Sequence, residues 1–152
     1  MKTVIQRVRE SSVWIKDQEY AAIGSGLLIL LGVEHGDTLE AAQHLAEKIV
    51  HLRIFEDQNG KMNHALRETK GDVLIVSQFT LASRCDCGRR PSFDSAAPPA
   101  LAEERYNQFV GIMQGLLGEQ HVKTGVFRAD MQIHLVNDGP VTFFLEQTPQ
   151  AD

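Results

Sequence analysis

Two short segments place uncharged hydrogen-bonding side chains where apolar stretches end. They are Ser77-Gln78-Phe79-Thr80 and Asn137-Asp138-Gly139-Pro140-Val141-Thr142. Hydroxyl and amide groups at such positions either satisfy the backbone at a strand end or act as donors and acceptors in a binding site. These residue types therefore allow hydrogen-bonded recognition or ester chemistry, and the purely structural role stays open at this point.

Ser77 and Thr80 would act as nucleophiles only with a base within hydrogen-bond reach. Neither hydroxyl lies in a Gly-x-Ser-x-Gly turn, and spacing pairs neither with a histidine. The six histidines, at positions 35, 44, 51, 64, 121 and 134, form no metal-ligating pattern. We assign none of them to catalysis and expect no metal.

The Gly139-Pro140 pair is most often an ordinary turn, since only about 5% of X-Pro bonds in folded proteins are cis. A cis bond here would fix two successive carbonyl groups in one direction. Such a turn would suit recognition of a ligand by backbone atoms.

The loop at 83–99 combines two cysteines with three arginines. Cys85 and Cys87 offer at most two soft ligands, with no histidine at finger-like spacing, so free thiols are favoured over a zinc site. Arg84, Arg89 and Arg90 either bind phosphates or form a solvated cluster, and both interpretations remain open.

Composition limits the class of protein. The chain has 152 residues, of which 43% are hydrophobic, which fits one globular domain. A formal net charge of −5 disfavours non-specific coating of nucleic acid, so any RNA contact must be local. No apolar run approaches a membrane span, no export signal or Gly-rich phosphate loop is visible, and two cysteines suit a reducing compartment. We expect a cytoplasmic protein without a membrane partner or a nucleotide cofactor.

Hydrophobic periodicity predicts the elements that position these residues. Strands are expected at 3–8, 12–15, 27–33, 72–81, 122–127, 131–136 and 141–146, with a tight hairpin turn at Asn59-Gly60. A capping box of Asp37 and Glu40 predicts a helix to about residue 52, and a second helix spans about 100–117 before Gly118. The pattern predicts one α/β domain over 1–148 with a short tail at 149–152. It should have a largely antiparallel, barrel-like sheet and two long helices.

Both segments, the first extended to Ala82, resemble the signature motifs of the D-aminoacyl-tRNA deacylase family. The similarity continues through residues 1–8, 52–57, 88–93 and 124–131 and covers nearly the whole chain. Cys85 and Cys87 depart from the family pattern, which leaves the function of their loop open.

The resemblance implies a three-layer fold, with both helices on one side, and a homodimer without cofactors. Its pocket would use Ser77, Gln78, Phe79 and Thr80 of one subunit and a cis Gly139-Pro140 turn of the other, with Met131, Asn137 and Arg7 also binding substrate. The substrate would be the ester of a D-amino acid, or glycine, with the 3′-terminal adenosine of tRNA. Backbone carbonyls would exclude L side chains, and the 2′-hydroxyl of the tRNA would assist hydrolysis.

Two other functions are possible. One is a small-molecule esterase or amidase with Thr80 or Ser77 as nucleophile, which Thr80→Ala would abolish. The other is a non-catalytic module that binds RNA or protein without turnover.

Overall fold

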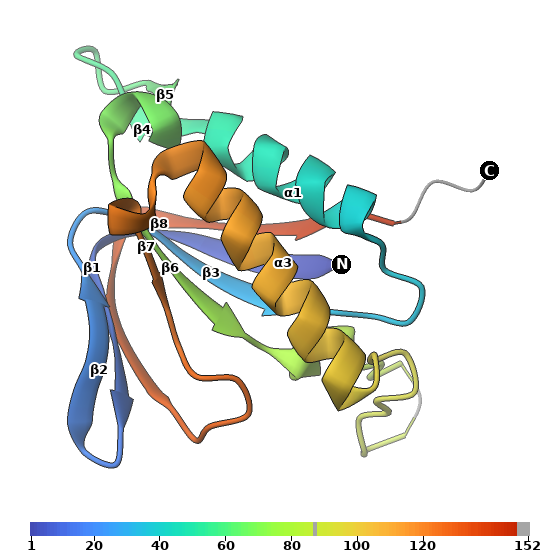
Figure 1. Ribbon diagram of the computed structural model, residues 1–152. Coiled ribbons are helices and arrows are strands. Elements are labelled where there is room, and N and C mark those ends of the chain that lie inside the picture. The colour runs from blue at the N-terminus through green and yellow to red at the C-terminus, as the bar shows by residue number, and fades with distance from the viewer. Residues whose placement is uncertain (87, 149–152) are drawn as a thin grey trace.

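The computed structural model describes residues 1–86 and 88–148, so Cys87 and the predicted tail at 149–152 lie outside the described residues. A curled, barrel-like sheet carries two long helices on one side (Figure 1). Its strands are β1 (Lys2–Ile15), β2 (Gln18–Ile23), β3 (Gly26–Gly32), β6 (Asp72–Ser77), β7 (Val122–Thr124) and β8 (Gln132–Glu146). A separate hairpin joins β4 (Arg53–Glu56) to β5 (Met62–Ala65) around the predicted Asn59-Gly60 turn.

The sheet is mainly antiparallel, as predicted. β1 pairs antiparallel with β2, β3 and β8, whereas β3 with β6 and β6 with β7 are parallel pairs. β3 therefore pairs with β1 and not with its neighbour in sequence, so the first three strands form no simple meander. In the sheet, β3 lies between β1 and β6, and β7 lies on the other side of β6.

The central strands are apolar throughout because both of their faces are covered. Leu27, Ile29, Val73 and Ile75 belong to the core beneath the helices, whereas Leu28, Leu74 and Val76 belong to a second core on the opposite face. Side chains of β2 and of the first half of β8 close this second core. Helices, central sheet and curled-back strands thus form the three layers.

Helices α1 (Leu39–His51) and α3 (Pro99–Leu117) pack on each other and on the sheet. Both predicted helices are confirmed, and Gly118 follows α3 with φ of 94°. The predicted capping box is wrong, since the N-cap is Thr38, whose side chain accepts from the N–H of Ala41 at 3.2 Å. The carboxylate of Asp37 instead accepts from the Glu34 N–H and from the α-amino group of Met1.

The strands differ from the prediction in several places. β2 was not predicted, and β7 ends at Thr124 and not at residue 127. β1 is one strand where two were expected, because its pairing with β8 shifts register at Arg9 and resumes at Glu10. β8 is likewise continuous through the segment expected to be a turn. β6 ends at Ser77 and gives way to the 3₁₀ helix η1 (Phe79–Ala82).

The remaining elements are short: α2 (Leu66–Thr69) precedes β6, and the 3₁₀ helix η2 (Glu119–His121) precedes β7. Of the helices in the described residues, none has both the length and the apolar content needed to cross a membrane.

Candidate active site

The first signature segment lies where β6 leaves the sheet. Ser77 is the last residue of β6, opposite Leu31 of β3, and the N–H of Gln78 donates to the Leu31 carbonyl at 2.8 Å. The backbone then turns at Gln78, with φ of −139° and ψ of 82°, into η1. This turn brings Phe79 and Thr80 to the surface at the end of the buried strand.

Two backbone amides are available at this turn. The first N–H groups of a helix have no partner inside it, and the first internal bond of η1 joins the N–H of Leu81 to the Gln78 carbonyl at 3.2 Å. Within the described residues, the N–H groups of Phe79 and Thr80 donate to no other group. A pair of adjacent free amides can bind an anionic oxygen.

The hydroxyl of Thr80 is held by an amide. Gln78 Nε2 donates to Thr80 Oγ1 at 2.5 Å, and an amide is not a base. No histidine or carboxylate of the described residues hydrogen-bonds to the hydroxyl of Ser77 or Thr80. The geometry thus gives neither hydroxyl the partner that a nucleophile requires.

The second signature segment protrudes from β8. Asn137 pairs with Val8 of β1, and Thr142 pairs with Gln6, so four residues of β8 stand opposite Arg7 alone. We call these four residues, 138–141, the β8 bulge. The Asn137 side chain closes it, because its Oδ1 accepts from the Val141 N–H at 2.8 Å and its Nδ2 donates to Thr142 Oγ1 at 3.0 Å.

The tip of the bulge is exposed and conformationally special. The Gly139-Pro140 peptide bond is cis, as the resemblance implied, and both residues are exposed. Gly139 has φ of 146°, a region that side-chain-bearing residues rarely adopt. A Cβ on Gly139 would stand 2.8 Å from the Val141 nitrogen, so this position requires glycine.

Arg7 fixes the bulge from beneath. It is 4% exposed, and its Nε donates to the Asp138 carbonyl at 3.0 Å while Nη1 donates to the Ile54 carbonyl at 2.7 Å. Nη2 lies 3.4 Å from Glu56 Oε1. Because the guanidinium makes all of these contacts with groups of the protein, Arg7 is a positioning residue for the bulge.

The two motifs lie far apart within one chain. Ser77 is level with Leu31 and Thr3, whereas the bulge stands opposite Arg7, four residues further along β1. The path crosses three inter-strand spacings, about 14 Å, and runs about 14 Å along the strands. The bulge therefore does not line the Ser77–Thr80 site of its own chain.

Met131 lies next to the end of β6. The N–H of Gly125 donates to the Ile75 carbonyl at 3.0 Å, which continues the β6–β7 pairing toward Ser77. The Met131 sulfur is 2.7 Å from where a Cβ on Gly125 would stand, with Val76 beyond it. The structure thus brings Met131 toward the first motif, whereas Asn137 and Arg7 belong to the second.

Tyr106 of α3 supports the strand that leads into the site. Its hydroxyl donates to the Ile75 carbonyl at 2.8 Å, and burial raises its pKa. The phenol therefore stays protonated and keeps this contact at ordinary pH.

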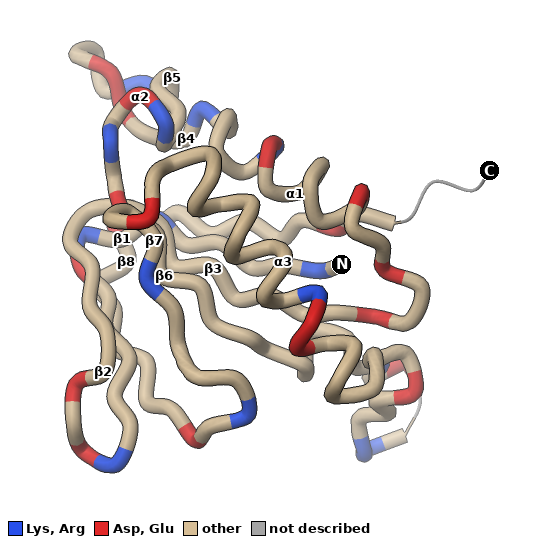
Figure 2. The backbone as a smooth tube through the Cα atoms, viewed as in Figure 1, with Lys and Arg blue, Asp and Glu red and all other residues tan. Residues whose placement is uncertain are grey.

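The loop that follows η1 adds aromatic and charged groups beside the first motif. The rings of Phe79 and Phe93 lie 5.1 Å apart, and the guanidinium of Arg84 pairs with Asp86 at 3.0 Å, which raises the pKa of Arg84 and lowers that of Asp86. Figure 2 shows acidic and basic residues dispersed over the whole chain, with both signs in this loop. The sequence pattern predicted no role for Phe93, although an aromatic residue within a polar, arginine-rich loop was the available signal.

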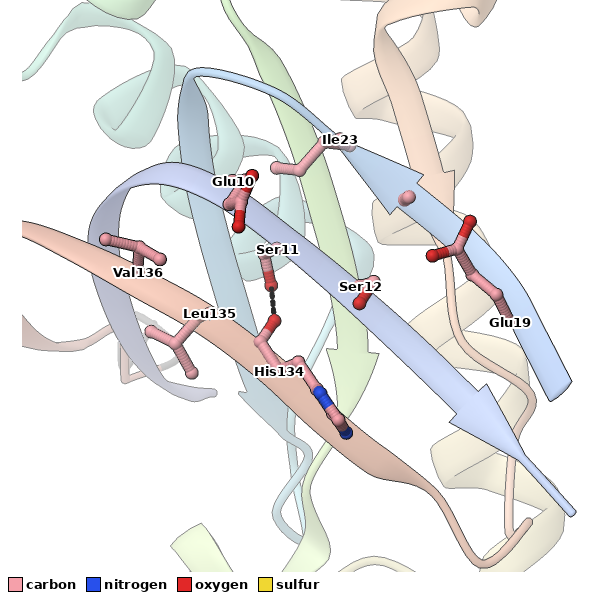
Figure 3. Close-up of a pocket in the computed structure, with 9 residues that line it drawn as sticks. Glu10, Ser11, Ser12, Glu19, Ile23, His134, Leu135 and Val136 are labelled. Carbon is pink, nitrogen blue, oxygen red and sulfur yellow. Dashed lines mark hydrogen bonds between the residues drawn. The ribbon is translucent and has the colours of Figure 1, made fainter. Parts of the chain in front are cut away.

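A separate pocket of about 330 Å³ lies between β1, β2 and β8 (Figure 3). Glu10, Glu19 and His134 line it, and the Ser11 hydroxyl donates to the His134 carbonyl at 3.0 Å. Neither signature motif contributes to its wall. No group of three or more metal-ligating side chains is arranged to hold a metal ion anywhere in the described residues.

The family model described as D-Tyr-tRNA(Tyr) deacylase matches residues 4–146. The chain belongs to this family. D-aminoacyl-tRNA deacylase of Geotalea uraniireducens is 57% identical over 150 residues, covering 99% of this chain and 95% of the relative. The protein of the same name from Protochlamydia amoebophila is 52% identical over 146 residues, covering 96% and 95%.

Solved structures share the fold of this chain. A structure titled c-Myc DNA Unwinding Element Binding Protein has a TM-score of 0.94 and 39% identity, covering 98% of this chain and 100% of its own. A structure described as a probable eukaryotic D-amino acid tRNA deacylase has a TM-score of 0.81 and 18% identity, covering 95% and 97%, which shows the shared fold.

Proposed function

We propose that this protein hydrolyses the ester bond between a D-amino acid, or glycine, and the 3′-terminal adenosine of tRNA. Membership of the deacylase family supports the substrate class. The single observation that carries the chemistry is the pair of free N–H groups of Phe79 and Thr80 at the exposed end of β6.

The active form is a homodimer in which the β8 bulge of one subunit enters the Ser77–Thr80 site of the other. The separation of the two motifs within one chain favours this arrangement. The outer edge of β8 pairs with no strand in the described residues, and Val136, Phe143 and Phe144 on β8 are 45%, 38% and 56% exposed. A second copy would cover this apolar edge strand.

Hydrolysis needs no protein nucleophile in this proposal. Attack of water on the ester carbonyl moves negative charge onto its oxygen, which the amides of Phe79 and Thr80 stabilise. A single donor of this kind contributes about 3–4 kcal/mol. The vicinal 2′-hydroxyl of the adenosine assists the attacking water, while Ser77, Gln78 and Met131 hold the adenosine and shape the site.

Selectivity for D-amino acids comes from exclusion. The Gly139-Pro140 turn, on a bulge fixed by Arg7 and Asn137, would supply the carbonyl groups for this. Facing the α-carbon of the substrate, these carbonyls clash with an L side chain and accept hydrogen or a D side chain. Exclusion by backbone carbonyls does not depend on the identity of the side chain, so many D-amino acids are substrates. The protein acts in the cytoplasm, where charged tRNA is found.

The test is release of amino acid from matched D-tyrosyl-tRNA and L-tyrosyl-tRNA, with a chelator present in one arm. We expect rapid release from the D-ester only, in both arms. Release no faster than the spontaneous rate from either ester, by a folded dimer, would overturn the proposal and favour a binding role.

A further inference from the structure

An exposed aromatic pair lies directly beside the free amides of η1. Phe79 and Phe93 are 58% and 42% exposed, and their ring planes are inclined at 47° with centroids 5.1 Å apart. Because the rings are tilted and not stacked face to face, ring surface remains open to solvent. Adjacent exposed aromatic side chains of this kind can mark a binding surface.

The backbone holds Phe93 in place. On one side, Arg84 and Ser92 exchange two backbone hydrogen bonds, of 2.8 and 2.9 Å. On the other, the Phe93 carbonyl accepts from the Ala96 N–H at 2.9 Å, and Ala96 bridges to Glu34 next to β3. The ring is therefore carried by an anchored backbone segment, and binding a ligand there requires little further ordering of the backbone.

The loop that carries Phe93 also carries cations. Arg84 is neutralised by Asp86, whereas Arg89 and Arg90 are exposed and form no ion pair with any described residue. Alternating aromatic rings and guanidinium groups recognise single-stranded nucleic acid, where bases stack on rings and phosphates pair with arginine.

We infer that Phe93, with the ring of Phe79, is a stacking platform for a base of the single-stranded tRNA 3′ end upstream of the terminal adenosine. Arg89 and Arg90 then contact the adjoining phosphates. The inference rests on the proposed function, because Phe79 carries one of the two amides placed at the ester, and the platform extends outward from it. The acceptor end is thus bound locally by a protein whose net charge is −5.

The experiment compares two substrates that differ only in the upstream nucleotides, D-tyrosyl-tRNA and the D-tyrosyl ester of adenosine. Phe93→Leu keeps an apolar side chain but removes the ring. We expect kcat/KM to fall about tenfold on the tRNA and to stay unchanged on the adenosine ester. Phe93→Trp should retain wild-type kcat/KM on the tRNA. Tyr20→Leu, at a site 56% exposed on β2, is the matched control and should change neither.

A second variant keeps the test independent of the packing of Phe93. Substitution of both Arg89 and Arg90 by Gln should lower kcat/KM on the tRNA and flatten its dependence on salt, again without effect on the adenosine ester.

Equal behaviour of the Phe93→Leu variant on both substrates would overturn the inference, whether activity is kept or lost. Dissociation of that variant into monomers in analytical ultracentrifugation would instead assign the rings to contact between copies. An inactive wild-type protein on both esters would overturn the proposed function itself, which separates the two failures.

Discussion

Arg7 Nε donates to the carbonyl oxygen of Asp138 at 3.0 Å, and this contact ties a buried cation of β1 to the backbone of the β8 bulge. The same guanidinium binds the Ile54 carbonyl, so one side chain joins the sheet, the β4–β5 hairpin and the bulge. A fork of several fixed donors suits this task better than a single ammonium group.

Arg7→Lys should therefore loosen the bulge. A lysine ammonium cannot keep both carbonyl contacts in the same geometry, so we expect D-selective kcat/KM to fall at least tenfold and stability to fall by about 2 kcal/mol. Steady-state deacylation and urea unfolding measure the two effects. Arg9→Lys is the control, since Arg9 is 75% exposed and pairs with the same Asp138; an equal effect there would remove the special role of Arg7.

Gly139→Ala should disable the exposed tip of the bulge. The added Cβ would meet the Val141 nitrogen at 2.8 Å and force an unfavourable φ, at a cost of about 1–3 kcal/mol. We expect loss of D-tyrosyl-tRNA hydrolysis with the fold retained. Gly36→Ala is the control, because Gly36 also has a positive φ, of 83°, but a Cβ added there would meet no atom within 4 Å. If it reduces activity as much, general destabilisation explains both variants.

Thr80→Val separates the two chemical interpretations of the first motif. The variant keeps the backbone N–H and the side-chain shape but loses the hydroxyl that accepts from Gln78. If the amides and the tRNA 2′-hydroxyl carry the reaction, kcat should fall by no more than about tenfold, the share of one hydrogen bond. Complete loss of single-turnover activity in a folded variant would point to a hydroxyl nucleophile.

The sequence predicted the elements whose signals are local. The continuous apolar run of β3, the periodicity of α1 and α3, and Gly118 after α3 all report on burial or capping within a few residues. The boundaries that failed depend on partners distant in sequence. β8 continues as one strand past the bulge because β1 pairs with it on both sides, which no local pattern reveals.

The candidate site was predictable in part for the same reason. Family resemblance identified Ser77, Thr80, Gly139 and Pro140, but not how Arg7 acts. Its contacts with Ile54 and Asp138 span 47 and 131 residues of sequence, so only the folded sheet brings them together.

Asp37 offers a last test, of stability apart from the site. Its Oδ1 accepts from the α-amino group of Met1 at 2.5 Å, with the side chains 2% and 0% exposed. Asp37→Asn would leave a buried ammonium without its counter-charge, and we expect a loss of about 3–5 kcal/mol in urea unfolding. Glu47→Gln is the control, because its pair with His51 is more than half exposed and contributes under about 0.5 kcal/mol. Equal midpoints for the two variants would mean that solvent reaches Met1 and Asp37 and screens their charges. The expected large difference would make the Met1–Asp37 pair an anchor for the first strand, on which Arg7 and the bulge depend.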